Sequence, residues 1–164
     1  MSSTVDELLA NAVTYEQSFE GPRAVIPTRH ITIVTCMDSR IDTFRIFGLQ
    51  SGEAHILRNA GGLATDDVLR SLVLSQRLLQ TREVILMHHT NCGLHRTNEA
   101  ALLAELEAES GHTPPYAFGA FEDLDEAVRQ AITRVREHRF LLHRDNVRGF
   151  VYEVETGHLR EVTL

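Results

Sequence analysis

The sequence predicts an α/β fold in which a mainly parallel sheet is flanked by helices. Short stretches rich in β-branched residues, such as 31–36, alternate along the chain with longer stretches whose apolar residues recur at every third or fourth position, such as 124–135. Strands that alternate with helices in this way form parallel sheets with helices on both faces. The chain of 164 residues contains no repeat and no Gly/Ser/Pro-rich linker, so we expect a single domain over residues 1–164.

The first predicted element is a helix over residues 4–18. Thr4 and Glu7 have the spacing of a capping box, and apolar residues then recur at helical intervals. Residues 31–36 follow as a buried strand, because this stretch is short, β-branched and uncharged. The next elements are a short helix over 43–47 and a second strand over 54–57.

A long helix is predicted to begin at Asp66 and Asp67, two acidic residues that suit the positive end of a helix dipole. Its apolar positions continue to Leu79, and the third strand follows over 84–87. The remaining predicted elements are a helix over 97–109, a helix over 124–135, a strand over 147–154 and a hairpin return over 155–163 around Gly157.

The composition excludes several functional classes. Acidic residues outnumber basic ones by 23 to 16, for a formal net charge of -7, and no run of arginines could follow a phosphate backbone, so we do not expect nucleic acid as a partner. All 16 basic residues are arginine. Without lysine the chain has no P-loop lysine, no Schiff-base lysine and no Ser-Lys catalytic pair.

The N-terminal segment indicates a cytoplasmic protein without membrane association. Its acidic, amphipathic residues lack the basic start and apolar stretch of a secretory signal, and no apolar run approaches the roughly 20 residues of a membrane span. In the reducing cytoplasm Cys36 and Cys92 are more typical of a metal site or of catalysis than of a disulfide. Taken alone, Cys36 is equally compatible with a small apolar core residue.

Two groups of reactive side chains lie where predicted strands end. Cys36, Asp38 and Arg40 alternate after the first strand, and they point to one side if the backbone stays extended. His89 and Cys92 are three residues apart, and they converge if the chain turns into a helix after the third strand. Parallel sheets bind ligands at the carboxyl ends of their strands, so the two groups meet if the first and third strands are neighbours.

Two thiols and an imidazole form a ligand set suited to Zn²⁺. Cys36, His89 and Cys92 would supply three ligands and leave a fourth position to water, as in catalytic sites. His88 is expected to point away, because adjacent strand residues face opposite sides. The segment after the second strand permits close backbone approach beside the metal, so we expect it to form a pocket wall for the substrate. The residues of this wall are Ala60, Gly61 and Gly62.

Three segments together resemble the β-class carbonic anhydrases, and specifically their short bacterial subgroup: CMDSR at 36–40, HILRNAGG at 55–62 and HHTNCG at 88–93. The resemblance implies about four parallel strands with an antiparallel edge strand. It also implies a homodimer or higher homo-oligomer, with the N-terminal helix over 4–18 packing on the partner subunit. No tryptophan is present, so we do not expect the secondary bicarbonate pocket that uses one in some members.

The resemblance further implies zinc bound by Cys36, His89 and Cys92, and reversible hydration of CO₂ to bicarbonate and a proton. It gives Asp38 two roles, either as fourth zinc ligand in a closed site or as partner of Arg40 in an open one. Asn91 stands where relatives often have aspartate, at a position that is not a ligand in the family.

Three other functions stay open on the sequence. Relatives of similar length hydrolyse CO₂-like molecules such as carbonyl sulfide or carbon disulfide with the same ligands. A non-catalytic zinc or bicarbonate-sensing module would keep Asp38 on the metal. A metal-free cysteine redox protein is disfavoured, because there is no Cys-x-x-Cys.

Overall fold

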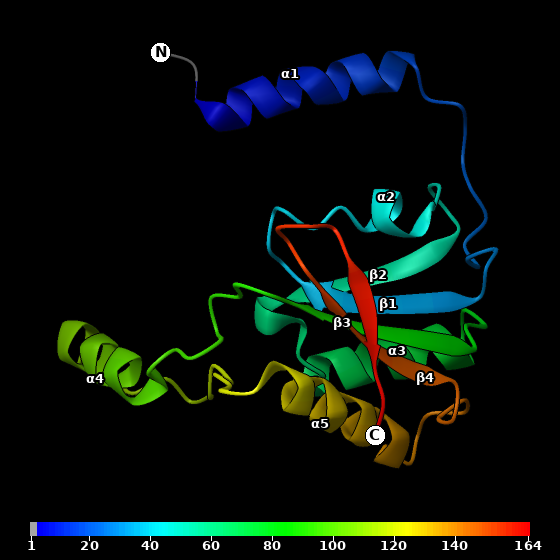
Figure 1. Ribbon diagram of the computed structural model, residues 1–164. Helices are drawn as coiled ribbons and strands as arrows, with labels where there is room; N and C mark the ends of the chain where they lie inside the picture. The colour runs from blue at the N-terminus through cyan, green and yellow to red at the C-terminus, as the bar shows by residue number, and fades with distance from the viewer. Residues whose placement is uncertain (1–2) are drawn as a thin grey trace.

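A computed structural model describes residues 3–164, and within them five strands form one sheet of order β2-β1-β3-β4-β5 (Figure 1). The first four strands run parallel, and β5 lies antiparallel to β4 at one edge. This topology confirms the predicted fold class. The strands are β1 (Ile31–Cys36), β2 (Ala54–Asn59), β3 (Glu83–His89), β4 (Val147–Tyr152) and β5 (Leu159–Val162).

The helices differ widely in how much of their surface is buried. Residues of α3 and α5 enter the core, whereas none of the residues of α1 or α4 is buried. Their bounds are α1 (Thr4–Gln17), α2 (Thr43–Phe47), the 3₁₀ turn η1 (Ala60–Gly62), α3 (Asp66–Arg77), α4 (Glu99–Ser110) and α5 (Leu124–Glu137). No helix among residues 3–164 is long and apolar enough to cross a membrane.

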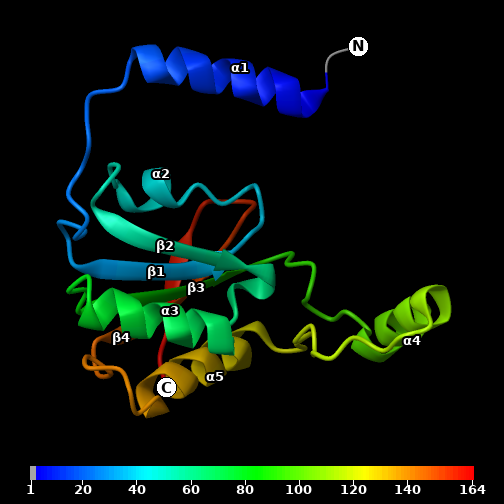
Figure 2. The ribbon, with the colours of Figure 1, turned by 180° about the vertical axis from the view of Figure 1, so that it is seen from behind.

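The main core lies between the sheet and the pair α3 and α5, which cover the same face (Figures 1 and 2). Leu72 of α3, Leu86 of β3 and Val128 of α5 are fully buried in it. The helical spacing of the apolar residues in α5 aims them at the sheet, as predicted. Gly149 of β4 lets α5 approach closely, because a Cβ there would collide with Val128.

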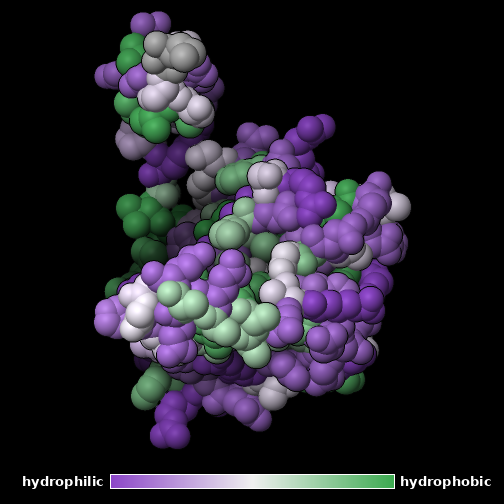
Figure 3. Space-filling view, turned by 90° about the vertical axis from the view of Figure 1, so that its left-hand side faces the viewer, coloured by the Kyte–Doolittle hydropathy of each residue, from purple (hydrophilic) through white to green (hydrophobic). Residues whose placement is uncertain are grey.

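The opposite face of the sheet also carries a helix, but it is only partly covered. The short α2 contributes Ile46 and Phe47 to a smaller cluster on this side. Helix α1 stands away from the sheet above it (Figures 1 and 3). Its apolar side chains are exposed, with Leu8 at 63% and Val13 at 58%.

The ends of several elements differ from the sequence prediction because of local hydrogen bonds. The capping box of α1 uses Ser3 and Asp6 rather than the predicted Thr4 and Glu7. Helix α4 begins at Glu99, later than predicted, because the Asn98 side chain accepts from the backbone N–H of Ala101 at 3.1 Å. Strands β2 and β3 continue past their predicted ends, since these residues still pair with neighbouring strands.

Strand order places the two reactive groups together. From β1 the chain continues to β2 on one side and then to β3 on the other, so the order reverses at β1. Thr35 of β1 pairs with Met87 of β3, which brings the carboxyl ends of both strands to one edge of the sheet. Ligand sites of parallel α/β sheets lie at such a point.

Candidate metal centre

Cys36, the last residue of β1, points its thiol into the interior and is only 5% exposed. The chain leaves the strand at the next residue, where the Met37 N–H donates to the Asn59 carbonyl at 2.8 Å. The backbone therefore does not stay extended over residues 36–40, the condition under which alternation would place these side chains on one side. Asp38 is brought to the same side by its contacts with Arg40 instead.

His89 ends β3, and Cys92 follows after a tight turn, not after the helical turn that we took as the condition for their convergence. Asn91 makes the turn possible with a φ of 52°, in the left-handed region that asparagine adopts more readily than most residues. The turn folds Cys92 back over the end of the strand. The expected convergence of His89 and Cys92 is present, but its cause is different.

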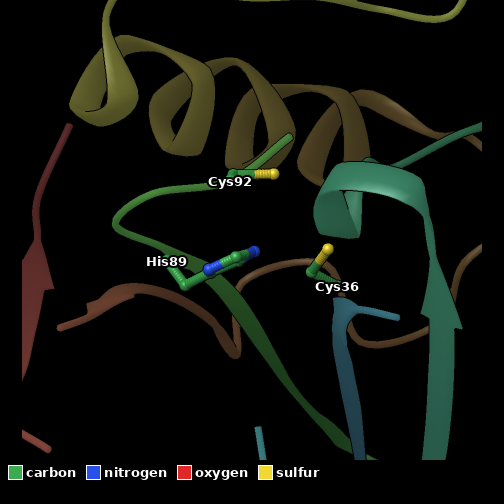
Figure 4. A group of neighbouring side chains, drawn as sticks. All are labelled: Cys36, His89 and Cys92. Carbon is green, nitrogen blue, oxygen red and sulfur yellow. The ribbon is translucent and has the colours of Figure 1, made fainter. Parts of the chain in front are cut away.

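The ligand atoms of Cys36, His89 and Cys92 lie within 4.8 Å of one another, and all three residues are buried. Figure 4 shows the imidazole and the two thiols converging from three sides. The Nδ1 of His89 is 2.8 Å from the Thr90 carbonyl, a contact that holds the ring proton on Nδ1. The Nε2 atom is then a buried lone pair, and it has no hydrogen-bond partner within residues 3–164.

The electrostatics of this group suit a cation. Burial raises the pKa of the Cys92 thiol, and the adjacent Cys36 raises it further. Burial also lowers the pKa of His89, which favours the neutral imidazole that binds metals. A divalent ion would offset the cost of two buried thiolates, and the S₂N donor set with an unpartnered Nε2 fits zinc.

Asp38 and Arg40 form a bidentate pair at the rim of this group. The Arg40 Nε donates to Asp38 Oδ1 at 2.9 Å, and one terminal nitrogen donates to Oδ2 at 2.6 Å. Arg40 thereby lowers the pKa of the Asp38 carboxyl well below its usual range. The Asp38 Oδ2 lies 3.9 Å from His89 Nε2, so an ionised carboxylate stands beside the three ligand atoms.

Arg58 of β2 is a structural residue of the site that the sequence reasoning missed. Its guanidinium donates to the carbonyls of Cys36, Asp38 and Ile41 at 2.9, 2.6 and 3.1 Å. These bonds fasten the segment after β1 to the neighbouring strand. The one available signal was a charged residue inside an otherwise uncharged strand.

The predicted pocket wall divides into two parts. Gly61 and Gly62 are buried with φ of 77° and 69°, and a Cβ on Gly62 would lie 2.8 Å from the Cys36 backbone nitrogen. Gly62 therefore allows close approach to the end of β1, as expected, whereas a Cβ on Gly61 would meet Leu94 and Leu63. Ala60 instead lines a cavity of about 330 Å³ beside Arg58, whose lining does not include the three ligand residues.

His88 points away from the ligand group, as its place in the strand indicated. Its ring is fully buried and lies 5.9 Å from the Phe121 ring, centroid to centroid. Burial lowers its pKa to about 4, so it is a neutral core residue at physiological pH. Cys36, His89 and Cys92 form the only group with metal-ligand spacing among the described residues.

A buried Cys₂His group at the reversal point of a parallel sheet, with an Asp-Arg pair at its rim, has the donor set and the location typical of a catalytic metal site. Comparison with known proteins identifies the family. The profile described as "Carbonic anhydrase" matches residues 31–115, more than half of the chain. The chain belongs to the β-carbonic anhydrase family and is an enzyme of that class.

Individual relatives match over nearly the whole chain. Beta-carbonic anhydrase 1 of Mycobacterium tuberculosis is 45% identical, covering 98% of this chain and 99% of its own. The crystal structure of carbonic anhydrase from Streptococcus mutans superposes with a TM-score of 0.90 at 36% identity, covering 99% of both chains. A carbon disulfide hydrolase of Acidianus is 33% identical, covering 81% of this chain and 77% of its own.

Proposed function

We propose that the protein catalyses the reversible hydration of CO₂ to bicarbonate and a proton, with zinc held by Cys36 Sγ, His89 Nε2 and Cys92 Sγ. The observation that carries this proposal is the convergence of these three buried donor atoms beside an ionised carboxylate. When bound, zinc supplies the Lewis acidity that lowers the pKa of a water molecule toward neutrality. The 45% identical relative named as a β-carbonic anhydrase supports the same reaction.

The chain's own residues would then position the attacking water. Asp38, held ionised by Arg40, is placed to accept a hydrogen bond from the attacking water and to orient its lone pair toward CO₂. The Nδ1–H of His89 donates to the Thr90 carbonyl. This bond fixes the tautomer that leaves Nε2 free for the metal.

We further propose that Ala60, Gly61 and Gly62 form the wall against which CO₂ is held. Gly62 brings its backbone against Cys36, where a Cβ would collide with the Cys36 nitrogen, and Gly61 packs against Leu94 and Leu63. CO₂ is small and uncharged, so a wall of backbone and a methyl group is sufficient to confine it. The neighbouring Leu94 closes the approach to Gly61.

A second candidate function is hydrolysis of carbon disulfide or carbonyl sulfide on the same site. The specific observation in its favour is the 33% identity to a protein named carbon disulfide hydrolase. A third, a sensing module with Asp38 on the metal, is less well supported because both Asp38 oxygens are engaged by Arg40.

The protein is proposed to act as a homodimer or higher homo-oligomer in the cytoplasm. The exposed apolar residues of α1 and the partly uncovered sheet face are surfaces that a second copy would bury. Two free cysteine ligands need a reducing compartment to stay available for metal, which supports the cytoplasmic location.

The proposal is tested by zinc content and by substrate choice. Cys36→Ser, His89→Ala and Cys92→Ser should each lose most of one bound zinc per chain, whereas the exposed His112→Ala should keep it. Stopped-flow assays of zinc-loaded protein should show hydration of CO₂ far faster than hydrolysis of carbon disulfide. Zinc retained in all three ligand variants, or turnover of carbon disulfide alone, would contradict the proposal.

A further inference from the structure

Glu155 lies at the tip of the hairpin between β4 and β5, in a turn with defined geometry. The backbone N–H groups of Thr156 and Gly157 both donate to the Glu153 carbonyl, at 3.3 and 2.8 Å, and the Glu153 N–H donates to the His158 carbonyl at 2.9 Å. These bonds fix the backbone on either side of Glu155. The hairpin therefore presents the Glu155 carboxylate in a set direction.

That direction is toward the turn after β3. The Thr90 hydroxyl donates to Glu155 Oε2 at 2.8 Å, and the Asn91 side-chain amide donates to Oε1. The Thr90 hydroxyl also accepts from the Val154 N–H at 3.0 Å. Both carboxylate oxygens thus bind the two residues that link the ligands His89 and Cys92.

Asn91 connects Glu155 to Arg40 through hydrogen bonds. Its left-handed backbone points the Asn91 carbonyl at Arg40, whose terminal nitrogen donates to it at 3.0 Å. The same nitrogen donates to Asp38 Oδ2 at 2.6 Å. A continuous chain of hydrogen bonds therefore runs from Glu155 through Asn91 and Arg40 to the Asp38 carboxylate.

We propose that Glu155 is a positioning residue that holds the Arg40 guanidinium, and through it Asp38, in the geometry used by the reaction. Arg40 needs such support because its side chain is 49% exposed and a long, solvated side chain loses conformational entropy when it is fixed. Glu155 acts on it in two ways, by holding the carbonyl that Arg40 binds and by placing a negative charge near the guanidinium.

The geometric part of this inference is tested without any assay of turnover. In the zinc-loaded protein we expect the Arg40 Nε–H, bonded to Asp38, to exchange slowly with water in ¹H–¹⁵N spectra. Glu155→Ala should accelerate this exchange several-fold. Glu155→Gln can keep an acceptor for Asn91 and should retain slow exchange. Glu153→Ala is the matched control on the same hairpin and should change nothing, because the Glu153 carboxylate accepts from the Thr156 hydroxyl of the same turn.

The catalytic part rests on the proposed function and is measured separately. Glu155→Ala should bind one zinc per chain and lose about tenfold in kcat/KM for CO₂. This is the lower end of the range for residues that hydrogen-bond to the groups around a metal and orient them. In an Arg40→Ala background the same substitution should have no further effect, since its influence passes through Arg40. Glu155→Gln should recover most of the activity.

Two outcomes overturn the inference. One is unchanged Arg40 Nε–H exchange in Glu155→Ala, and the other is a tenfold loss that persists in the Arg40→Ala background, which would indicate a general effect on the turn. Wild-type protein that binds zinc but does not hydrate CO₂ would instead refute the proposed function, and the exchange measurement would still decide the role of Glu155.

Discussion

At the scale of single residues, the site depends on how Arg40 holds Asp38. The guanidinium donates to both carboxylate oxygens in a planar, two-pronged contact that lysine could not make. This contact keeps Asp38 ionised and directs it away from direct contact with His89, which is 3.9 Å distant. Without Arg40, an unpaired carboxylate would stand beside three metal-ligand atoms.

We therefore expect Arg40→Ala to keep zinc but to lose CO₂ hydration by at least about 100-fold, the scale expected when a reacting group is no longer held in position. Asp38→Ala should behave alike, and the double variant should be little worse than either, because residues acting as one unit are not additive. Stopped-flow rates and zinc content check this.

Arg148→Ala removes a comparable exposed Arg-carboxylate pair, with Glu161, and serves as control. Near wild-type turnover of Arg40→Ala at neutral pH would contradict the role.

The sequence predicted the candidate ligands but not the residues that support them. Cys36, His89 and Cys92 could be found because their side chains are soft metal ligands placed at strand ends. Arg58 could not, because it binds three backbone carbonyls that come together only in the fold. The role of Asn91 likewise depends on its φ of 52°, which no residue pattern specified.

At the scale of elements, the start of α4 fixes a loop that packs near the site. The Glu99 carboxylate accepts from the backbone N–H groups of Phe118, Gly119 and Ala120, at 2.7, 3.0 and 2.8 Å. Gly119 sits against Leu63, close enough that a Cβ would lie 2.6 Å from its Cδ1. One carboxylate therefore holds the loop against the segment that follows the two wall glycines.

This contact predicts a pH dependence. The three N–H groups lower the pKa of Glu99, so its stabilisation is fully present above the unfolded value of about 4.3 and is lost as pH falls through the lower folded value. Hydrogen exchange of the amides of residues 118–120, corrected for intrinsic rates, should lose protection below about pH 4. Glu99→Gln should show weak protection at all pH values. Protection that is independent of pH in the wild type would contradict this assignment.

The sequence predicted the strands and the core helices well, because their signal is local. Residues 31–36 and 43–47 match β1 and α2 at both ends, since an uncharged β-branched run and a short amphipathic turn are bounded by breakers. The ends of β2 and β3 were missed. Their last residues, including Arg58 and His89, are polar, and they extend the strands only because neighbouring strands pair with them.

At the scale of the whole molecule, a single chain leaves one face of the sheet partly uncovered and the apolar side chains of α1 exposed. Residues 4–17 are all exposed, and their apolar members include Val5, Leu8 and Leu9 at 60–63% exposure. Periodicity predicted this helix correctly, yet it could not show that none of its apolar side chains is buried by residues 3–164.

We expect α1 to be an oligomer contact. Leu8→Asp with Leu9→Asp should raise the dissociation constant of the oligomer by at least about a hundredfold, because burial of each leucine contributes about 1.5–3 kcal/mol. Sedimentation velocity over a concentration series measures this. Gln17→Glu adds a charge at an exposed polar position of the same helix and should leave assembly unchanged. Equal association of wild type and the double variant would remove α1 from the interface.

The central claim is that zinc at Cys36, His89 and Cys92 enables this chain to hydrate CO₂. The most direct measurement is a titration of zinc into metal-free protein, with stopped-flow CO₂ hydration recorded at each step. The rate should rise in proportion to bound zinc and level off at one zinc per chain, and His89→Ala should show no such rise. A rate that does not depend on zinc, or that rises equally in His89→Ala, would contradict the claim.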